Sequence, residues 1–218
     1  LQQGGAYFTG FAETYLGNGD KDDARDLLEK AKNYNLQPVD KQRVSRTLAL
    51  LYIEEDMLND AHRLCNSIIE GDRLLPDDEL ADVYFISGRI LNLQKRYSDA
   101  EAVINSAPGM PDRIKDDLLI SAYMELGKAY YHTGNYPKAA SSFEKGFDLG
   151  YAADNRDYWN LRLDLAQAYM SAGEHDRARV LFTEISEGGD NISQQRAALK
   201  IGSMDLEEQL KRLPMGGD

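Results

Sequence analysis

Small and aromatic residues alternate with polar ones along this chain in a pattern that is typical of paired amphipathic helices. One copy consists of a small residue, an aromatic residue, a turn, an alanine and a second aromatic residue, at Gly127, Tyr130, Gly134, Ala139 and Phe143. A second copy keeps the same order and the same offsets, at Ala166, Tyr169, Gly173, Ala178 and Phe182. Each copy predicts two antiparallel helices whose faces pack on each other and on the next copy.

Three weaker copies are in register with these two. The alanine of the second helix gives the clearest series, at Ala24, Ala61, Ala100, Ala139 and Ala178. Successive members are 37, 39, 39 and 39 residues apart. Chance apolar periodicity does not keep one spacing through four steps, so the sequence predicts an array of five helix pairs. The small residues of the first helices are expected where helices cross, because a bulky side chain there would separate them.

The fourth copy resembles the tetratricopeptide repeat. Within residues 121–150 the family's positions are occupied by Tyr123, Leu126, Gly127, Tyr130, Gly134, Tyr136, Ala139 and Phe143. Gly146 replaces the family's second alanine, and Tyr151 replaces its closing proline. The resemblance covers roughly residues 5–186 and implies an all-α, right-handed superhelical solenoid of about five helix-turn-helix repeats. The units are longer than the family's period of about 34 residues.

We predict one repeat array rather than several domains. Its units are expected at residues 5–35, 40–70, 78–107, 113–150 and 157–186. A C-terminal capping helix is expected at 187–212, with the polar outer face that the end of an array needs, followed by a flexible tail at 213–218. Because the chain begins without Met and almost inside its first unit, we expect a fragment from which a leader, an anchor or a neighbouring domain has been removed.

The charge of the chain excludes two classes of partner. The net charge is -12 and the pI is about 4.7, so the chain lacks the basic surface that neutralises phosphates, and we expect no nucleic-acid binding. Anionic membranes are disfavoured for the same reason. Direct membrane insertion is not expected either, because no stretch approaches the roughly 18 uninterrupted apolar residues of a membrane span. The compartment stays open, with the bacterial periplasm or envelope and the cytoplasm both compatible.

Few residues have the spacing of catalytic or metal-binding groups. Cys65 is the only cysteine and stands where Phe143 and Phe182 stand in other units, which predicts a small core residue. The alternative, a reactive thiol, would need a base such as His62 beside it. The three histidines lack metal-ligand spacing, and no nucleophile elbow, phosphate-binding loop or carboxylate dyad appears. We therefore expect no metal, no cofactor and no catalysis.

The resemblance also implies where a partner binds, because the first helices of the family line a concave groove. The partner-binding residues carried over in this way are Arg46, Phe85, Arg89, Asn92, Met124, Lys128, Tyr131, Gln167 and Met170. Arg89, Lys128 and Gln167 occupy one equivalent position in three consecutive units. This row of donors with apolar neighbours suits an acidic and apolar peptide. The alternative is that Lys128 pairs with Glu125 on its own helix, and Arg89 with Asp82 or another neighbour.

These observations favour a noncatalytic protein-interaction scaffold that binds a peptide or protein segment in a concave groove and belongs to a larger assembly. The alternative is a regulatory or substrate-recruiting portion of a longer enzyme. The clamp that some family members use for the carboxylate of chaperone tails is not present, because no window of three units carries the required Lys, Asn and Arg residues.

Overall fold

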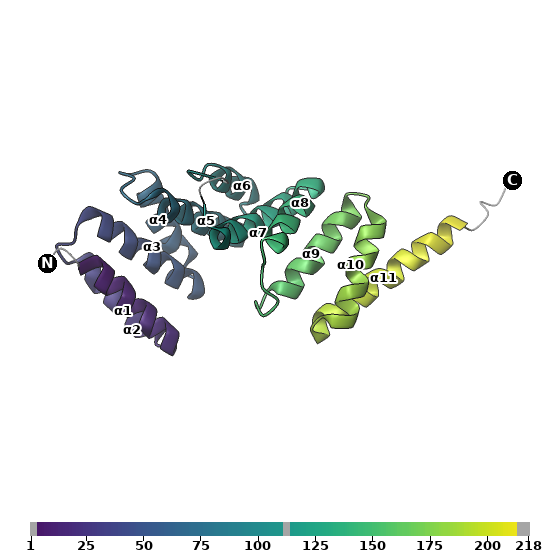
Figure 1. Ribbon diagram of the computed structural model, residues 1–218, viewed down its shortest axis with the longest axis horizontal. Coiled ribbons are helices and arrows are strands. Elements are labelled where there is room, and N and C mark those ends of the chain that lie inside the picture. The colour runs from purple at the N-terminus through teal and green to yellow at the C-terminus, as the bar shows by residue number, and fades with distance from the viewer. Residues whose placement is uncertain (1–3, 111–113, 213–218) are drawn as a thin grey trace. The chain divides into compact units, whose positions relative to one another are not determined.

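The computed structural model describes residues 4–110 and 114–212, and the secondary structure within these ranges is helical, without a strand (Figure 1). This confirms the all-α prediction. The helices in chain order are α1 (Gly4–Asn18), α2 (Lys21–Lys32), α3 (Pro38–Glu54), α4 (Leu58–Ile69), α5 (Asp77–Leu93), α6 (Tyr97–Asn105), α7 (Asp116–His132), α8 (Tyr136–Asp148), α9 (Tyr158–Ser171), α10 (His175–Gly188) and α11 (Asn191–Arg212). The tail expected at 213–218 lies outside the described residues.

The chain forms two compact units, Leu1–Glu125 and Leu126–Asp218, and the boundary falls inside α7. In the first unit each helix packs on the next from α1 to α6, and α3 also contacts both α1 and α5. In the second unit α9 contacts α8, α10 and α11, and α10 packs on α11. Within each unit alternate helices therefore form two layers, as in an array of helical repeats.

Small residues occupy the helix crossings, as predicted. A Cβ atom added to Gly127 of α7 would lie 2.5 Å from two ring carbons of Phe143 in α8, and one added to Gly88 of α5 would collide with the side chain of Ile104 in α6. Phe143 is completely buried. The absence of a side chain at the two glycines is what allows these helices to approach each other.

The backbone repeats with the same period as the alanines. The turn between the two helices of each pair contains one residue with positive φ, at Gly19, Asp56, Lys95, Gly134 and Gly173. These positions follow one another at the 37, 39, 39 and 39 residue intervals of the alanine series. Asp56 and Lys95 adopt the left-handed conformation without being glycine, with φ of 60° and 61°.

The last helix differs from the expected cap. Its inner face is buried in the second unit through Ser193, Ala197 and Met204. The outer face exposes large apolar side chains, namely Ile192, Leu199, Leu206 and Leu210. The outer face therefore combines polar and charged residues with these apolar side chains.

Candidate functional site

The residues that the sequence suggests for partner binding are divided between the two units. Arg46 of α3, Phe85, Arg89 and Asn92 of α5, and Met124 of α7 lie in the first unit. Lys128 and Tyr131 of α7 and Gln167 and Met170 of α9 lie in the second.

Three residues of the first unit are buried rather than displayed. Phe85 and Met124 are each 3% exposed and Asn92 is 8% exposed. The amide of Asn92 donates hydrogen bonds to the backbone oxygen of Glu125, at 2.9 Å, and to its carboxylate oxygen Oε2, at 2.8 Å. The position of these residues on the first helices is correct, but the neighbouring helices cover them. Their side chains thus belong to the interior, and the hydrogen bonds of Asn92 join α5 to α7.

The two arginines of the first unit have different surroundings. Arg46 is half-buried, and its guanidinium lies 3.7 Å from a carboxylate oxygen of Glu79 and 3.7 Å from one of Asp82, both in α5. Burial raises the pKa of Asp82, and the Arg46 charge opposes that increase. Arg89 is exposed and makes no ion pair or hydrogen bond with the described residues. Asp82 is therefore the partner of Arg46 and not of Arg89.

In the second unit, polar side chains of α7, α9 and α11 come together on one layer of helices. The Tyr131 hydroxyl of α7 donates to Oε1 of Gln167 in α9 at 3.3 Å. The Arg196 guanidinium of α11 donates to Oδ1 of Asn160 in α9 at 3.2 Å. We call this surface the polar face, and it consists of Lys128, Tyr131, Asn160, Asp164, Gln167 and Arg196.

Asp164 is the electrostatic centre of the polar face. Burial of its carboxyl group raises its pKa from 3.8 to about 6, against the opposing influence of the nearby positive charges of Lys128 and Arg196. Burial therefore outweighs the attraction of two cations. The face carries two cations in a chain whose net charge is -12, and Arg196 acts on the carboxylate of Asp190 as well as on Asp164.

The sequence indicates that Arg196 lies on the polar face, through an offset that the pattern of five repeats did not include. Arg196 precedes Gly202 by six residues, and Asn160 precedes the buried anchor Ala166 by the same number. Treating Gly202 as a sixth anchor places α11 as a further first helix, with Arg196 on the same face as Asn160. Asp164 gives no such signal, because its burial depends on the neighbouring helices.

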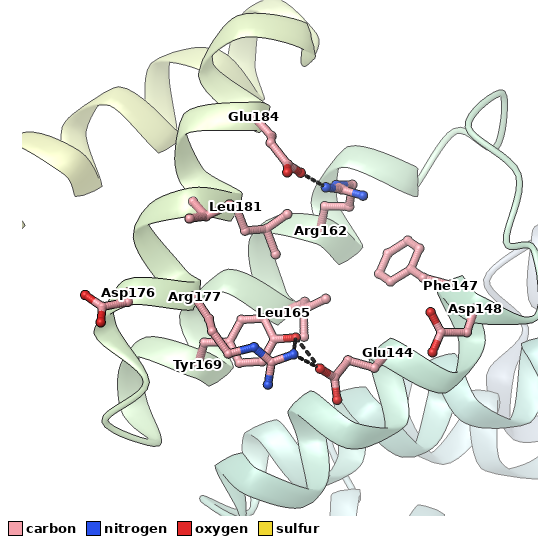
Figure 2. A pocket seen from close by; sticks show the side chains of 11 residues that line it. Glu144, Phe147, Asp148, Arg162, Leu165, Tyr169, Asp176, Arg177, Leu181 and Glu184 are labelled. Atoms are coloured by element: carbon pink, nitrogen blue, oxygen red, sulfur yellow. Dashed lines mark hydrogen bonds and ion pairs between the residues drawn. The ribbon is translucent and has the colours of Figure 1, made fainter.

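A pocket of about 600 Å³ lies between α8, α9 and α10 of the second unit (Figure 2). The buried side chains of Leu165 and Leu181 contribute its apolar part. An ion pair joins Arg162 of α9 to Glu184 of α10 on one side. The Arg162 guanidinium also lies 5.8 Å from the ring centre of Phe147 in α8, which is a cation–π arrangement.

A second charged group lies on the opposite side of the pocket. The Arg177 guanidinium of α10 stacks over the ring of Tyr169 in α9, 4.1 Å from its centre, and forms an ion pair with Glu144 of α8 (Figure 2). The Tyr169 hydroxyl donates to the same carboxylate, at 2.5 Å. Burial and this carboxylate raise the pKa of Tyr169. These contacts connect three helices, and the pocket's carboxylates outnumber its guanidiniums four to two, so it differs in charge from the polar face.

The remaining candidate chemistry has no support in the described parts of the chain. Cys65 is a buried free thiol, and burial raises its pKa to about 12, as expected for a core residue. Among the described residues no group of three or more His, Cys, Asp or Glu side chains is placed to hold a metal ion. No helix in the same ranges is long and apolar enough to cross a membrane.

Comparison with known proteins identifies the repeat. Residues 134–200 match the family model of the tetratricopeptide repeat. Among solved structures, pilF of Pseudomonas aeruginosa has a TM-score of 0.68 at 21% identity, covering 99% of this chain and 94% of its own. MamA from Desulfovibrio magneticus RS-1 has a TM-score of 0.62 at 15% identity, with 84% and 94% covered. YrrB, a TPR protein with an unusual peptide-binding site, has a TM-score of 0.62 at 13% identity, with 88% and 90% covered. At these identities the likeness concerns the fold. A search of curated proteins gave no match to this sequence.

Proposed function

Because the chain carries tetratricopeptide repeats, we propose that it is a noncatalytic protein-interaction scaffold and that its polar face binds a partner segment with acidic and apolar side chains. Proteins with this fold are generally interaction scaffolds. The finer assignment, to the polar face of α7, α9 and α11, rests on the charge and composition of that surface.

The observation that carries the proposal is the presence of two cations close together on the polar face of a strongly acidic chain. Lys128 and Arg196 both act on Asp164, and Arg196 also acts on Asp190, so two cations lie beside two carboxylates. A chain of net charge -12 repels acidic molecules in general. An acidic segment is therefore favoured where cations are gathered, and a guanidinium suits recognition of a carboxylate.

Apolar contacts are available beside the charges. Tyr131 and Met170 are half-buried, so part of each side chain remains at the surface. Methionine adapts its shape to different apolar partners, and tyrosine combines an apolar ring with a hydroxyl that Gln167 already orients. A segment in which acidic and apolar side chains alternate would satisfy both kinds of group.

In the first unit, Arg46 and Arg89 remain in the proposal as contacts of that unit alone. Arg89 is exposed, so it can meet an acidic side chain without breaking an existing pair. Arg46 already faces Glu79 and Asp82, and an additional carboxylate would have to displace one of them. We expect the larger contribution from Arg89.

The test uses fluorescent peptides of alternating acidic and apolar residues, together with the partner recovered by affinity pulldown from the native host. Binding is measured by fluorescence anisotropy against the chain and against the double variant Lys128→Glu, Arg196→Glu. Loss of charge-assisted contacts costs about 2 to 5 kcal/mol, so the variant should bind at least tenfold more weakly while keeping its helical circular dichroism.

A matched control makes the same change of charge elsewhere. Lys30 of α2 and Lys138 of α8 are exposed and lie outside the polar face, so Lys30→Glu, Lys138→Glu should leave the affinity nearly unchanged. Equal weakening by both double variants would mean that only the net charge matters. Unchanged binding by the folded polar-face variant would place the binding surface elsewhere.

A further inference from the structure

The outer face of α11 displays four large apolar side chains that no described residue covers. Ile192 is 70% exposed, Leu199 is 76% exposed, and Leu206 and Leu210 are each 56% exposed. Isolated exposed apolar residues are normal in proteins, but a continuous row on one helix indicates a contact surface. We call this row the α11 stripe.

The spacing of the α11 stripe is that of a helix-pairing seam. Ile192, Leu199 and Leu206 follow one another at intervals of seven residues, and Leu210 comes one turn after Leu206. A seven-residue repeat keeps apolar side chains on one side of a helix for its whole length. Met204 and the other buried residues of α11 face α9 and α10, so the stripe points away from the second unit.

We propose that the α11 stripe binds the α11 stripe of a second copy of this chain, with the two helices antiparallel. Gly202 and Ser203 lie midway between Leu199 and Leu206, and a Cβ atom added to Gly202 would meet nothing within 4 Å. Small residues at the centre of the stripe allow two helices to approach closely. With the twofold axis at this point, Leu199 of one copy lies level with Leu206 of the other.

The charges beside the stripe favour this arrangement. Lys200 and Glu207 make no ion pair or hydrogen bond with the described residues. In the antiparallel register Glu207 lies level with residue 198 of the second copy, about 3 Å along the axis from Lys200 of that copy at the 1.5 Å rise of a helix. Each dimer therefore gains this Lys–Glu pair twice. A parallel pair would instead place the Lys200 and Glu207 side chains of the two copies on opposite sides of the seam, where they form no such pair.

The dimer follows the rule for twofold interfaces, in which one surface patch is complementary to itself. A second copy fits the stripe better than an unrelated helix does, because both the leucines and the charges match under the same rotation. The proposal goes beyond the scaffold function and does not depend on the polar face, since Lys200 and Glu207 are not among its residues.

The first experiment measures self-association by sedimentation equilibrium between about 1 and 200 µM, since an interface of one helix per copy is small. The purified chain should show a monomer–dimer equilibrium. Leu199→Asp should weaken dimerisation by about tenfold or more, because it places a charge at the centre of the apolar contact. The matched control is Val180→Asp on α10, since Val180 is 61% exposed and lies outside the stripe.

The second experiment separates a self-complementary interface from any other contact. Lys200→Glu and Glu207→Lys should each weaken the homodimer, because each creates like charges twice. Mixing the two variants should restore dimers, since both pairs then become opposite in sign, and the double variant in one chain should dimerise like the original.

Three results would overturn the proposal. One is a chain that stays monomeric at every concentration, and another is a dimer that withstands Leu199→Asp while the variant keeps its helical signal. The third is a mixture of the two charge variants that associates no better than either alone.

Discussion

Replacing Asp164 with Asn should make the protein more stable at neutral pH, and the gain should shrink as the pH falls. Burial raises the pKa of the Asp164 carboxyl group to about 6, although Lys128 and Arg196 favour its charged form. In the unfolded chain the group returns to its ordinary value of 3.8. The folded protein thus holds a carboxylate that would be better solvated in the unfolded state.

The size of the effect follows from the difference between these two pKa values. The difference is about two units, and each unit corresponds to about 1.4 kcal/mol, so ionised Asp164 costs up to about 3 kcal/mol of stability. A raised carboxyl pKa means that the folded state binds more protons than the unfolded state between pH 4 and 6. Stability from this group therefore falls as the pH rises through that window and is constant above it. At pH 5 the folded group is mostly protonated, and about half of the cost remains.

The assay is urea denaturation of the parent chain and of Asp164→Asn at pH 5 and pH 8. Trp159 is the only tryptophan and lies in α9, five residues before Asp164, so its fluorescence reports the unfolding of the helix in question. The lower pH stays above the pI of about 4.7. We expect Asn to raise the free energy of unfolding by about 3 kcal/mol at pH 8 and by about half as much at pH 5.

A control substitution distinguishes this effect from a general change of charge. Asp176 is an exposed carboxylate in α10 of the same unit, and Asp176→Asn should change the stability little and equally at both pH values. The reasoning is refuted by an Asp164→Asn variant that is no more stable than the parent chain at pH 8. A gain that does not depend on pH would refute it as well, because the titration of Asp164 would then not be its source.

Other changes test the packing and the turns. Gly127→Leu should overpack the crossing of α7 and α8 and lower the free energy of unfolding by about 1 to 3 kcal/mol, whereas Gly202→Ala, in open space, should not lower it. Lys95→Gly should stabilise the protein by up to about 1 kcal/mol, because a left-handed conformation is strained for lysine. The reverse substitution at the equivalent turn, Gly134→Lys, should destabilise it. Thermal denaturation measures both effects. The Cys65 thiol, whose burial raises its pKa to about 12, should not react with a disulfide reagent in the native protein at pH 8, and one equivalent should react after unfolding in guanidinium.

Local patterns were sufficient to predict the helices and their pairing. Gly88 and Gly127 reveal the helix crossings, because each crossing requires a small residue at one defined position in the sequence. The turns show where such a local residue preference no longer predicts the backbone. Gly19, Gly134 and Gly173 mark three of them in the sequence, but the backbone has the same conformation at Lys95, where the residue type gives no indication.

The candidate site was less accessible from the sequence, because exposure depends on which neighbouring helix covers a side chain. Phe85 and Met124 stand at positions that face the groove in the resembled family, yet each is only 3% exposed. Arg46 is expected to meet a partner, and no sequence pattern indicates that its guanidinium also lies beside carboxylates of α5. A repeat consensus gives the direction of a residue on its own helix, whereas burial and ion pairing depend on residues in the adjacent unit.

The instability expected at Asp164 also bears on what the polar face does. A buried carboxylate that lowers stability would be of no advantage to a face whose only role is solvation, because Asn would fill the same space without a charge. The carboxylate attracts both Lys128 and Arg196, but its own charge also repels acidic molecules. Asp164→Asn removes that negative charge and leaves both cations in the chain. If the polar face binds an acidic segment through its cations, the same variant should therefore be more stable and should also bind an acidic peptide more tightly.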